Sequence, residues 1–271
     1  MRILFIGDVV GSGGRKAVQA LSEGLQKEYG CDFCIANGEN MAGGNGMTKP
    51  LLDEFKPSQV DVFTSGDHTW DQREFPGQID RLDNVLRPMN FPTCQPGRGW
   101  GVFTARNGAK VGVVNLIGRV FIKLNSSSPF DAADQAIREI QRETNVIFVD
   151  FHAEATSEKI ALGHYLDGRV SALVGTHTHV QTGDERVLPK GTAFICDAGM
   201  VGAKNSVLGR DAKAVIENFR TGMPMRFEVS NDDVTLNAVV VTIDEDCGRA
   251  TAIERVSKDY HTFNGRCGIN A

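Results

Sequence analysis

Short apolar runs alternate with helical patterns along most of this chain, and this alternation restricts the folds that it can adopt. The helical patterns cover residues 15–29, 129–144 and 157–166. The apolar runs that we predict as strands lie at residues 2–7, 32–36, 60–65, 110–116, 146–151, 170–175 and 192–196. Such β–α alternation predicts an α/β protein with a largely parallel central sheet. After about residue 222 two alternating runs, 234–243 and 250–256, predict antiparallel strands.

We expect one domain that covers residues 1–271. The chain has no internal repeat, no low-complexity tract and no linker rich in Pro, Gly or Ser, and its length is sufficient to bury a substantial core. The first apolar stretch spans only about six residues, too short for a secretion signal or a membrane span. The six cysteines are scattered, as is typical of reduced thiols. We therefore expect a cytoplasmic protein without membrane association.

Five of the predicted strands are followed at once by side chains that can bind metal ions. These side chains belong to Asp8, to Asn37, Glu39 and Asn40, to Asp67 and His68, to His152, and to His177 and His179. In an open α/β sheet the ligand site lies beyond the carboxyl ends of the strands, so we expect these residues to meet in one crevice. A mixture of carboxylates and imidazoles is typical of transition-metal sites.

Most of these residues also have an ordinary structural explanation when taken singly. Asp8 could cap a turn, Glu39 could lie on the surface of a turn-rich loop, and His152 could be a buried, hydrogen-bonded histidine. The pair His177 and His179 resists this explanation, because a spacing of two at a strand end places both rings on one side. The recurrence of all of them at the same end of the predicted strands favours a metal site.

The overall charge also favours bound cations. The net charge of −5 and the absence of a basic cluster argue against a nucleic-acid groove. An acidic protein that handles a phosphate anion has to neutralise it locally, which metal ions can do. The glycine-rich residues 11–14 and 43–46 do not match the G-x-G-x-x-G dinucleotide fingerprint, and we interpret them as turns or close approaches of the backbone to the site.

Taken in order, the motifs resemble those of the calcineurin-like metallophosphoesterases. That family has an Asp after the first strand, a bridging acid after the second, a GNH element, a lone His and a terminal GHxH. Here the corresponding segments are GDVVG (7–11), NGEN (37–40), GDHTWD (66–71), DFHAE (150–154) and GTHTHV (175–180). NGEN, together with ATSEK (155–159) and DERVLPKGTAFICDAGM (184–200), is similar to a bacterial subfamily of 2′,3′-cyclic-nucleotide 2′-phosphodiesterases.

The resemblance implies a fold, an activity and two metal ions. The fold would be an α/β/β/α sandwich with mixed, largely parallel central sheets, and the activity that of a metal-dependent phosphoric diester hydrolase. The metals would be two divalent ions, iron or manganese, with zinc as the alternative. The family pattern places one ion on Asp8, Glu39, Asn40 and His179, and the other on Glu39, Asp67, His152 and His177. A hydroxide bridging the ions would attack phosphorus, and His68 would be the general acid.

The implied substrate is a small phosphodiester, with a 2′,3′-cyclic nucleotide as the leading candidate. A phosphomonoesterase, a nuclease acting on RNA ends, and a regulatory protein that binds a nucleotide at a weakly active metal site are the alternatives. A homo-oligomer is compatible with the sequence.

Two positions depart from the broad family pattern. Val10 stands where most members have a histidine, so that one ligand has to come from elsewhere, and Asn40 is the available oxygen donor. Asp67 replaces the asparagine of the GNH element and adds a negative charge to the site.

Overall fold

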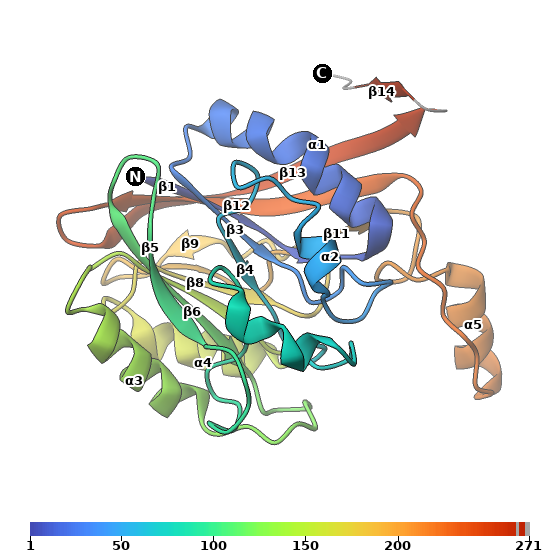
Figure 1. Cartoon of the computed structure of the whole chain (residues 1–271), viewed down its shortest axis with the longest axis horizontal. Helices are drawn as coiled ribbons and strands as arrows, with labels where there is room; N and C mark the ends of the chain where they lie inside the picture. The colour runs from blue at the N-terminus through green and yellow to red at the C-terminus, as the bar shows by residue number, and fades with distance from the viewer. Residues whose placement is uncertain (264–265, 269–271) are drawn as a thin grey trace.

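Two β-sheets pack face to face, with helices on both outer sides (Figure 1). The structure is a computed structural model that describes residues 1–263 and 266–268, with side chains described through residue 260. Among these described residues, every helix is too short or too polar to span a bilayer.

The first sheet is mixed, and its parallel strands carry the N-terminal half of the site. Within the described residues its main path runs β14 (Arg266–Gly268), β13 (Arg249–Phe263), β12 (Val234–Asp244), β1 (Arg2–Ile6), β3 (Phe33–Asn37) and β4 (Val62–Thr64). Strands β1, β3 and β4 are parallel to one another, whereas β12 is antiparallel to both β1 and β13. The short strands β2 (Asp8–Val9) and β11 (Met200–Ala203) pair with each other, and β11 also pairs with β12.

The second sheet is largely parallel. Its order is β5 (Trp100–Thr104), β6 (Lys110–Ile117), β7 (Ile147–His152), β8 (Ala172–Thr176), β10 (Ala193–Ile195) and β9 (Arg186–Val187). Among the residues that the structure describes, only the edge strands β5 and β9 of this sheet run antiparallel to their neighbours.

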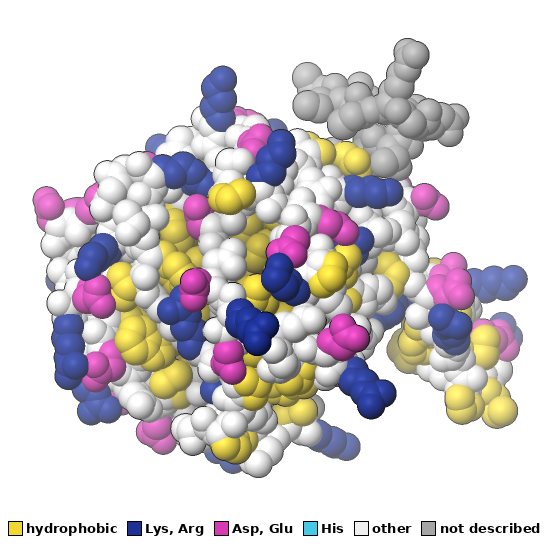
Figure 2. All heavy atoms as spheres, viewed as in Figure 1, with side chains coloured by type: hydrophobic (Ala, Val, Ile, Leu, Met, Phe, Trp, Pro, Cys, Tyr) yellow, Lys and Arg dark blue, Asp and Glu magenta, His cyan; other side chains and the backbone are white. Residues whose placement is uncertain are grey.

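Three helices cover the sheets and one projects away from them. Helix α1 (Gly11–Tyr29) lies over the first sheet, and α3 (Pro129–Ile140) and α4 (Thr156–Leu166) lie over the second (Figure 1). Helix α2 (Lys49–Leu52) and the 3₁₀ turns η1 (Phe75–Gly77) and η2 (Ile79–Arg81) are short. Helix α5 (Ala212–Thr221) stands out from the body with exposed Ile216 and Phe219 (Figures 1 and 2).

Strand β1 shows how alternating side chains build the layers. Ile3 and Phe5 face the second sheet, where Phe5 stacks on Phe148 at a centroid distance of 5.3 Å. Leu4 and Ile6 point the other way, into the cluster beneath α1. A third cluster fills the space between the second sheet and helices α3 and α4. The predicted α/β/β/α sandwich with mixed, largely parallel sheets is therefore confirmed.

The predicted elements agree with the structure, with informative differences. The seven strands predicted between residues 2 and 196 begin and end within about two residues of the observed bounds. Helix α1 begins at Gly11 and not at residue 15, so of the two interpretations of residues 11–14 the turn was wrong, whereas the Gly11 N–H does approach the site and donates to the carbonyl of Asn40 at 3.0 Å. The glycines permit close helix packing, because a Cβ at Gly14 would lie 2.4 Å from the carbonyl oxygen of Val201. Helix α3 begins as predicted but ends at Ile140, after which Thr144 Oγ1 donates to the carbonyl of Lys110.

The antiparallel strands after residue 222 are confirmed, although β12 lies in the interior of the first sheet beside β1. Strands β5, β9 and β11 and helix α5 were not predicted. On the face that Figure 2 shows, Lys and Arg side chains are interspersed with Asp and Glu, in accord with the absence of a broad basic surface there.

Candidate metal centre

The seven predicted metal ligands lie at the carboxyl ends of strands from both sheets. From the first sheet, Asp8 follows β1, Glu39 and Asn40 follow β3, and Asp67 follows β4; from the second, His152 ends β7, and His177 and His179 follow β8. We expected these residues to meet in one crevice, and the structure brings them together. Because the two sheets face each other, the candidate ligands meet between the ends of both sheets.

Four of these side chains form a tight cluster. One ligand atom from each of Glu39, Asp67, His152 and His177 lies within 4.8 Å of all the others. His152 Nε2 is 2.9 Å from Asp67 Oδ1, 3.2 Å from Glu39 Oε1 and 2.9 Å from His177 Nδ1. A single ring nitrogen can donate only one hydrogen bond, so it cannot satisfy these three neighbours together. Two imidazoles and two carboxylates around a common centre fit a transition-metal ion.

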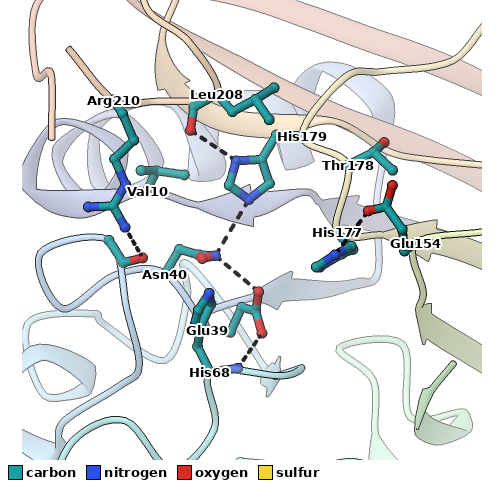
Figure 3. Close-up of a pocket in the computed structure, with 11 residues that line it drawn as sticks. Val10, Glu39, Asn40, His68, Glu154, His177, Thr178, His179, Leu208 and Arg210 are labelled. Carbon is teal, nitrogen blue, oxygen red and sulfur yellow. Dashed lines mark hydrogen bonds and ion pairs between the residues drawn. The ribbon is translucent and has the colours of Figure 1, made fainter. Parts of the chain in front are cut away.

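The remaining predicted ligands are Asn40, His179 and Asp8. Asn40 Nδ2 is 3.0 Å from Glu39 Oε1 and 3.5 Å from His179 Nε2 (Figure 3). Asp8 is completely buried, and its Oδ1 has no hydrogen-bond partner among the described residues. His152 Nδ1 lies 3.9 Å from this oxygen, so a buried carboxylate oxygen without a hydrogen bond fits a cation ligand, since its desolvation is otherwise poorly compensated. A ligating Asn40 would present its Oδ1, which requires the opposite amide orientation.

The two histidines after β8 differ from our expectation. They lie beyond the strand and have positive φ angles of 104° at His177 and 64° at His179, so their rings do not share one face of a strand. His177 Nδ1 lies 2.9 Å from His152 Nε2 in the cluster. His179 points to Asn40, with its Nδ1 3.2 Å from the carbonyl oxygen of Leu208 (Figure 3). Such backbone conformations cost a non-glycine residue on the order of 1–3 kcal/mol and are common at functional sites.

The electrostatics of the cluster suit a positive charge. Burial raises the pKa of Asp8 against the attraction of His179 and His152. Burial also acts to raise the pKa of Asp67, but hydrogen bonds with His152 and His177 outweigh it and hold that pKa well below its usual range. Burial acts to lower the pKa of His152, yet Glu39 and Asp67 raise it well above the ordinary value. The carboxylates thus stabilise positive charge among them.

A buried network behind His152, which the sequence analysis missed, fixes the orientation of its ring. Thr176 Oγ1 donates to Asp150 Oδ1 at 2.8 Å and lies 2.9 Å from His152 Nδ1. Because the Thr176 hydroxyl hydrogen is engaged, its oxygen accepts from Nδ1–H, so Nε2 is the ring nitrogen that faces the cluster and would bind a cation once its proton is lost. Burial raises the pKa of Asp150 to about 7. The available signal was a charged residue inside an apolar strand, two positions before His152.

His68 lies beside the cluster. Its Nε2 is 3.9 Å from Asp67 Oδ2, and its Nδ1 is 2.8 Å from Asp71 Oδ2 and 3.1 Å from Asn45 Nδ2. Asp71 and Asn45, which were not singled out from the sequence, therefore orient the ring.

A cavity of about 310 Å³ opens over these groups (Figure 3). It is lined by Val10, Glu39, Asn40, Gly44, His68, Glu154, His177, Thr178, His179, Leu208 and Arg210. Val10, at the position of the family histidine, contributes an apolar wall. Arg210 Nη2 donates to the carbonyl of Gly44 at 2.9 Å and to Asn45 Oδ1 at 2.5 Å, so its described partners are neutral oxygens. Burial lowers the pKa of Arg210.

Known proteins are similar to this chain in sequence and in fold. The sequence model of the YmdB-like protein family matches residues 4–256. The chain is 48% identical over 264 residues to the 2′,3′-cyclic-nucleotide 2′-phosphodiesterase of Bacillus subtilis, covering 97% of this chain and 99% of that protein. A hypothetical protein from Thermus thermophilus has a TM-score of 0.88 at 37% identity, with coverage of 96% and 99%. A novel phosphatase from Mycoplasma pneumoniae has a TM-score of 0.88 at 33% identity, with coverage of 96% and 93%.

Proposed function

The chain belongs to the YmdB-like protein family, and from this membership we propose that it is a metal-dependent phosphodiesterase that hydrolyses 2′,3′-cyclic nucleotides. The observation that carries the proposal is the cluster of Glu39, Asp67, His152 and His177, of which Glu39 and His177 line an open cavity. The name of the Bacillus subtilis relative supports the substrate.

We assign two divalent ions to the site, iron or manganese, with zinc as the alternative. The cluster around His152 would hold one ion, and Asp8, Asn40 and His179 would hold the other, with Glu39 shared. Glu39 supports this division because its side chain contacts both His152 and Asn40. When bound, such ions supply Lewis-acid chemistry, which polarises phosphoryl oxygens and lowers the pKa of a coordinated water.

His68 is placed to protonate the leaving oxygen. Its ring lines the cavity, and its Nδ1 lies 2.8 Å from Asp71 Oδ2, which also accepts from Asn45 Nδ2 at 3.1 Å. With Nδ1–H donated to Asp71, Nε2 can hold a proton toward the substrate.

We expect His68→Ala to lower kcat by about two to four orders of magnitude, the range for a lost general acid, with little change in metal content. A p-nitrophenyl phosphodiester should lose far less activity, because nitrophenolate leaves without a proton. The measurement is kcat on 2′,3′-cyclic AMP and on the nitrophenyl ester, alongside metal analysis. Loss of metal would make His68 a ligand, and equal losses on both substrates would exclude the acid role.

Arg210 brings a positive charge to the cavity wall, where a phosphate anion would lie. We expect Arg210→Gln to raise KM for 2′,3′-cyclic AMP by about 10–100-fold, since a hydrogen bond to a charged group contributes roughly 1.5–3 kcal/mol. The effect on kcat should be smaller. Arg220→Gln removes the same charge from an exposed position on α5 and serves as the control. An unchanged KM in Arg210→Gln would refute substrate contact.

Turnover of three substrates tests the proposed function. 2′,3′-Cyclic AMP should be hydrolysed faster than p-nitrophenyl phosphate and a short RNA. Preference for the monoester would favour a phosphomonoesterase, preference for RNA a nuclease, and nucleotide binding without turnover a regulatory protein.

We further propose that residues 1–271 form one domain, since a single core cluster joins both sheets from Ile3 to Ala250. The cytoplasmic location and a homo-oligomeric state stay predictions.

A further inference from the structure

A buried ion pair lies beneath the loop that carries two of the assigned ligands. Lys159, from the ATSEK segment at the start of α4, approaches Asp197, which follows β10, with Nζ and Oδ2 2.8 Å apart. Their side chains are 2% and 1% exposed. Neither residue lines the cavity, and the proposed chemistry does not use them.

The Asp197 carboxylate holds the ligand segments through the backbone. Its Oδ2 accepts from the N–H of Thr178 at 2.9 Å, and Thr178 lies between His177 and His179, the two ligands with positive φ. Its Oδ1 accepts from the N–H of Gly199 at 2.9 Å.

Gly199 extends this support to the other side of the site. Its carbonyl oxygen accepts from the backbone N–H of Asp8 at 3.0 Å. One carboxylate therefore connects the backbone next to His177, His179 and Asp8, which the proposed function divides between both metal ions.

The chemistry of the contacts explains why a charged pair occurs here. An ionised carboxylate can accept from both backbone N–H groups and from Lys159 at once, whereas an amide would turn its NH₂ toward one of these donors. A buried carboxylate requires a countercharge, because desolvation without one is strongly unfavourable. Lys159 supplies that charge from the side away from the cavity.

We propose that Lys159 and Asp197 are positioning residues that hold His177 and His179 in their strained backbone conformation and thereby set the metal affinity. This inference rests on the proposed function, in which both histidines are ligands. It predicts weaker metal binding in variants whose altered side chains never touch the metal.

The test measures Co²⁺ binding to metal-free full-length protein by titration and by the visible absorption of the bound ion. The double variant Lys159→Met/Asp197→Asn removes both charges, so that no unpaired charge is buried. We expect its affinity for Co²⁺ to fall about 10–100-fold, the usual effect of lost support for metal ligands, with an altered absorption spectrum. Lys159→Gln/Asp197→Asn, which also removes both charges but retains a hydrogen-bond donor at position 159, is the milder second variant, and a smaller loss of affinity is expected.

Leu162→Ala on α4 is the control, because Leu162 is buried in the cluster between α4 and the second sheet. It should destabilise the protein thermally yet retain the wild-type Co²⁺ affinity. Wild-type affinity in both charge variants, or an equal loss in Leu162→Ala at matched destabilisation, would overturn this inference alone. A wild-type protein that binds no Co²⁺ would overturn the metal assignment together with it.

Discussion

Glu39→Gln is expected to leave no measurable turnover of 2′,3′-cyclic AMP in a protein that remains folded. Glu39 Oε1 is 3.2 Å from His152 Nε2 and 3.0 Å from Asn40 Nδ2, so one carboxylate serves both assigned metal positions. A glutamine has nearly the same shape, but it lacks the negative charge that balances two cations and has one acceptor oxygen in place of two. Turnover should therefore be lost while the stability of the folded protein is retained, because removing a buried charge also removes its desolvation cost.

The measurement is initial rate, metal content and melting temperature after reconstitution with excess metal. Asp167→Asn is the matched control, since it makes the same carboxylate-to-amide change at a buried position. Asp167 lies at the C-terminal end of α4, where it accepts from the backbone N–H groups of Lys190 and Thr192. The Asp167→Asn variant should keep wild-type activity. Near wild-type activity in metal-replete Glu39→Gln would refute the shared-carboxylate assignment.

Removal of metal is expected to abolish activity, and manganese or ferrous iron should restore it. The cluster offers two imidazoles and two carboxylates, a donor set suited to transition metals, whereas magnesium favours oxygen ligands. Re-addition should also raise the melting temperature, because a ligand that binds only the folded state stabilises it.

The experiment dialyses the protein against a chelator and then titrates it with single metals under anaerobic conditions. Recovery with zinc alone would identify zinc as the metal of the site, in place of iron or manganese. Full activity of the metal-free protein would contradict the metal-dependent mechanism, and recovery with magnesium alone would contradict the proposed ligand set.

The amino-acid sequence alone predicted the candidate ligands and the strands that precede them. These strands are continuous apolar runs, and side chains such as Asp8 and Asp67 follow shortly after them. The local pattern of apolar and polar residues therefore predicts both the strands and the candidate ligands. Strand β12 shows the limit of such patterns. It is apolar on both faces, and its place between β1 and β13 depends on pairing across more than two hundred residues of chain.

The tertiary structure alone decided how the candidate residues are grouped and supported. It placed the candidate ligands between two facing sheets, turned His177 and His179 toward different neighbours, and brought Asp150 behind His152 and Lys159 against Asp197. These arrangements depend on contacts between residues that are distant along the chain, on backbone angles beyond the strand ends and on the hydrogen-bond partners of buried charges. Local periodicity encodes none of these, because it reports only which face of an element is apolar.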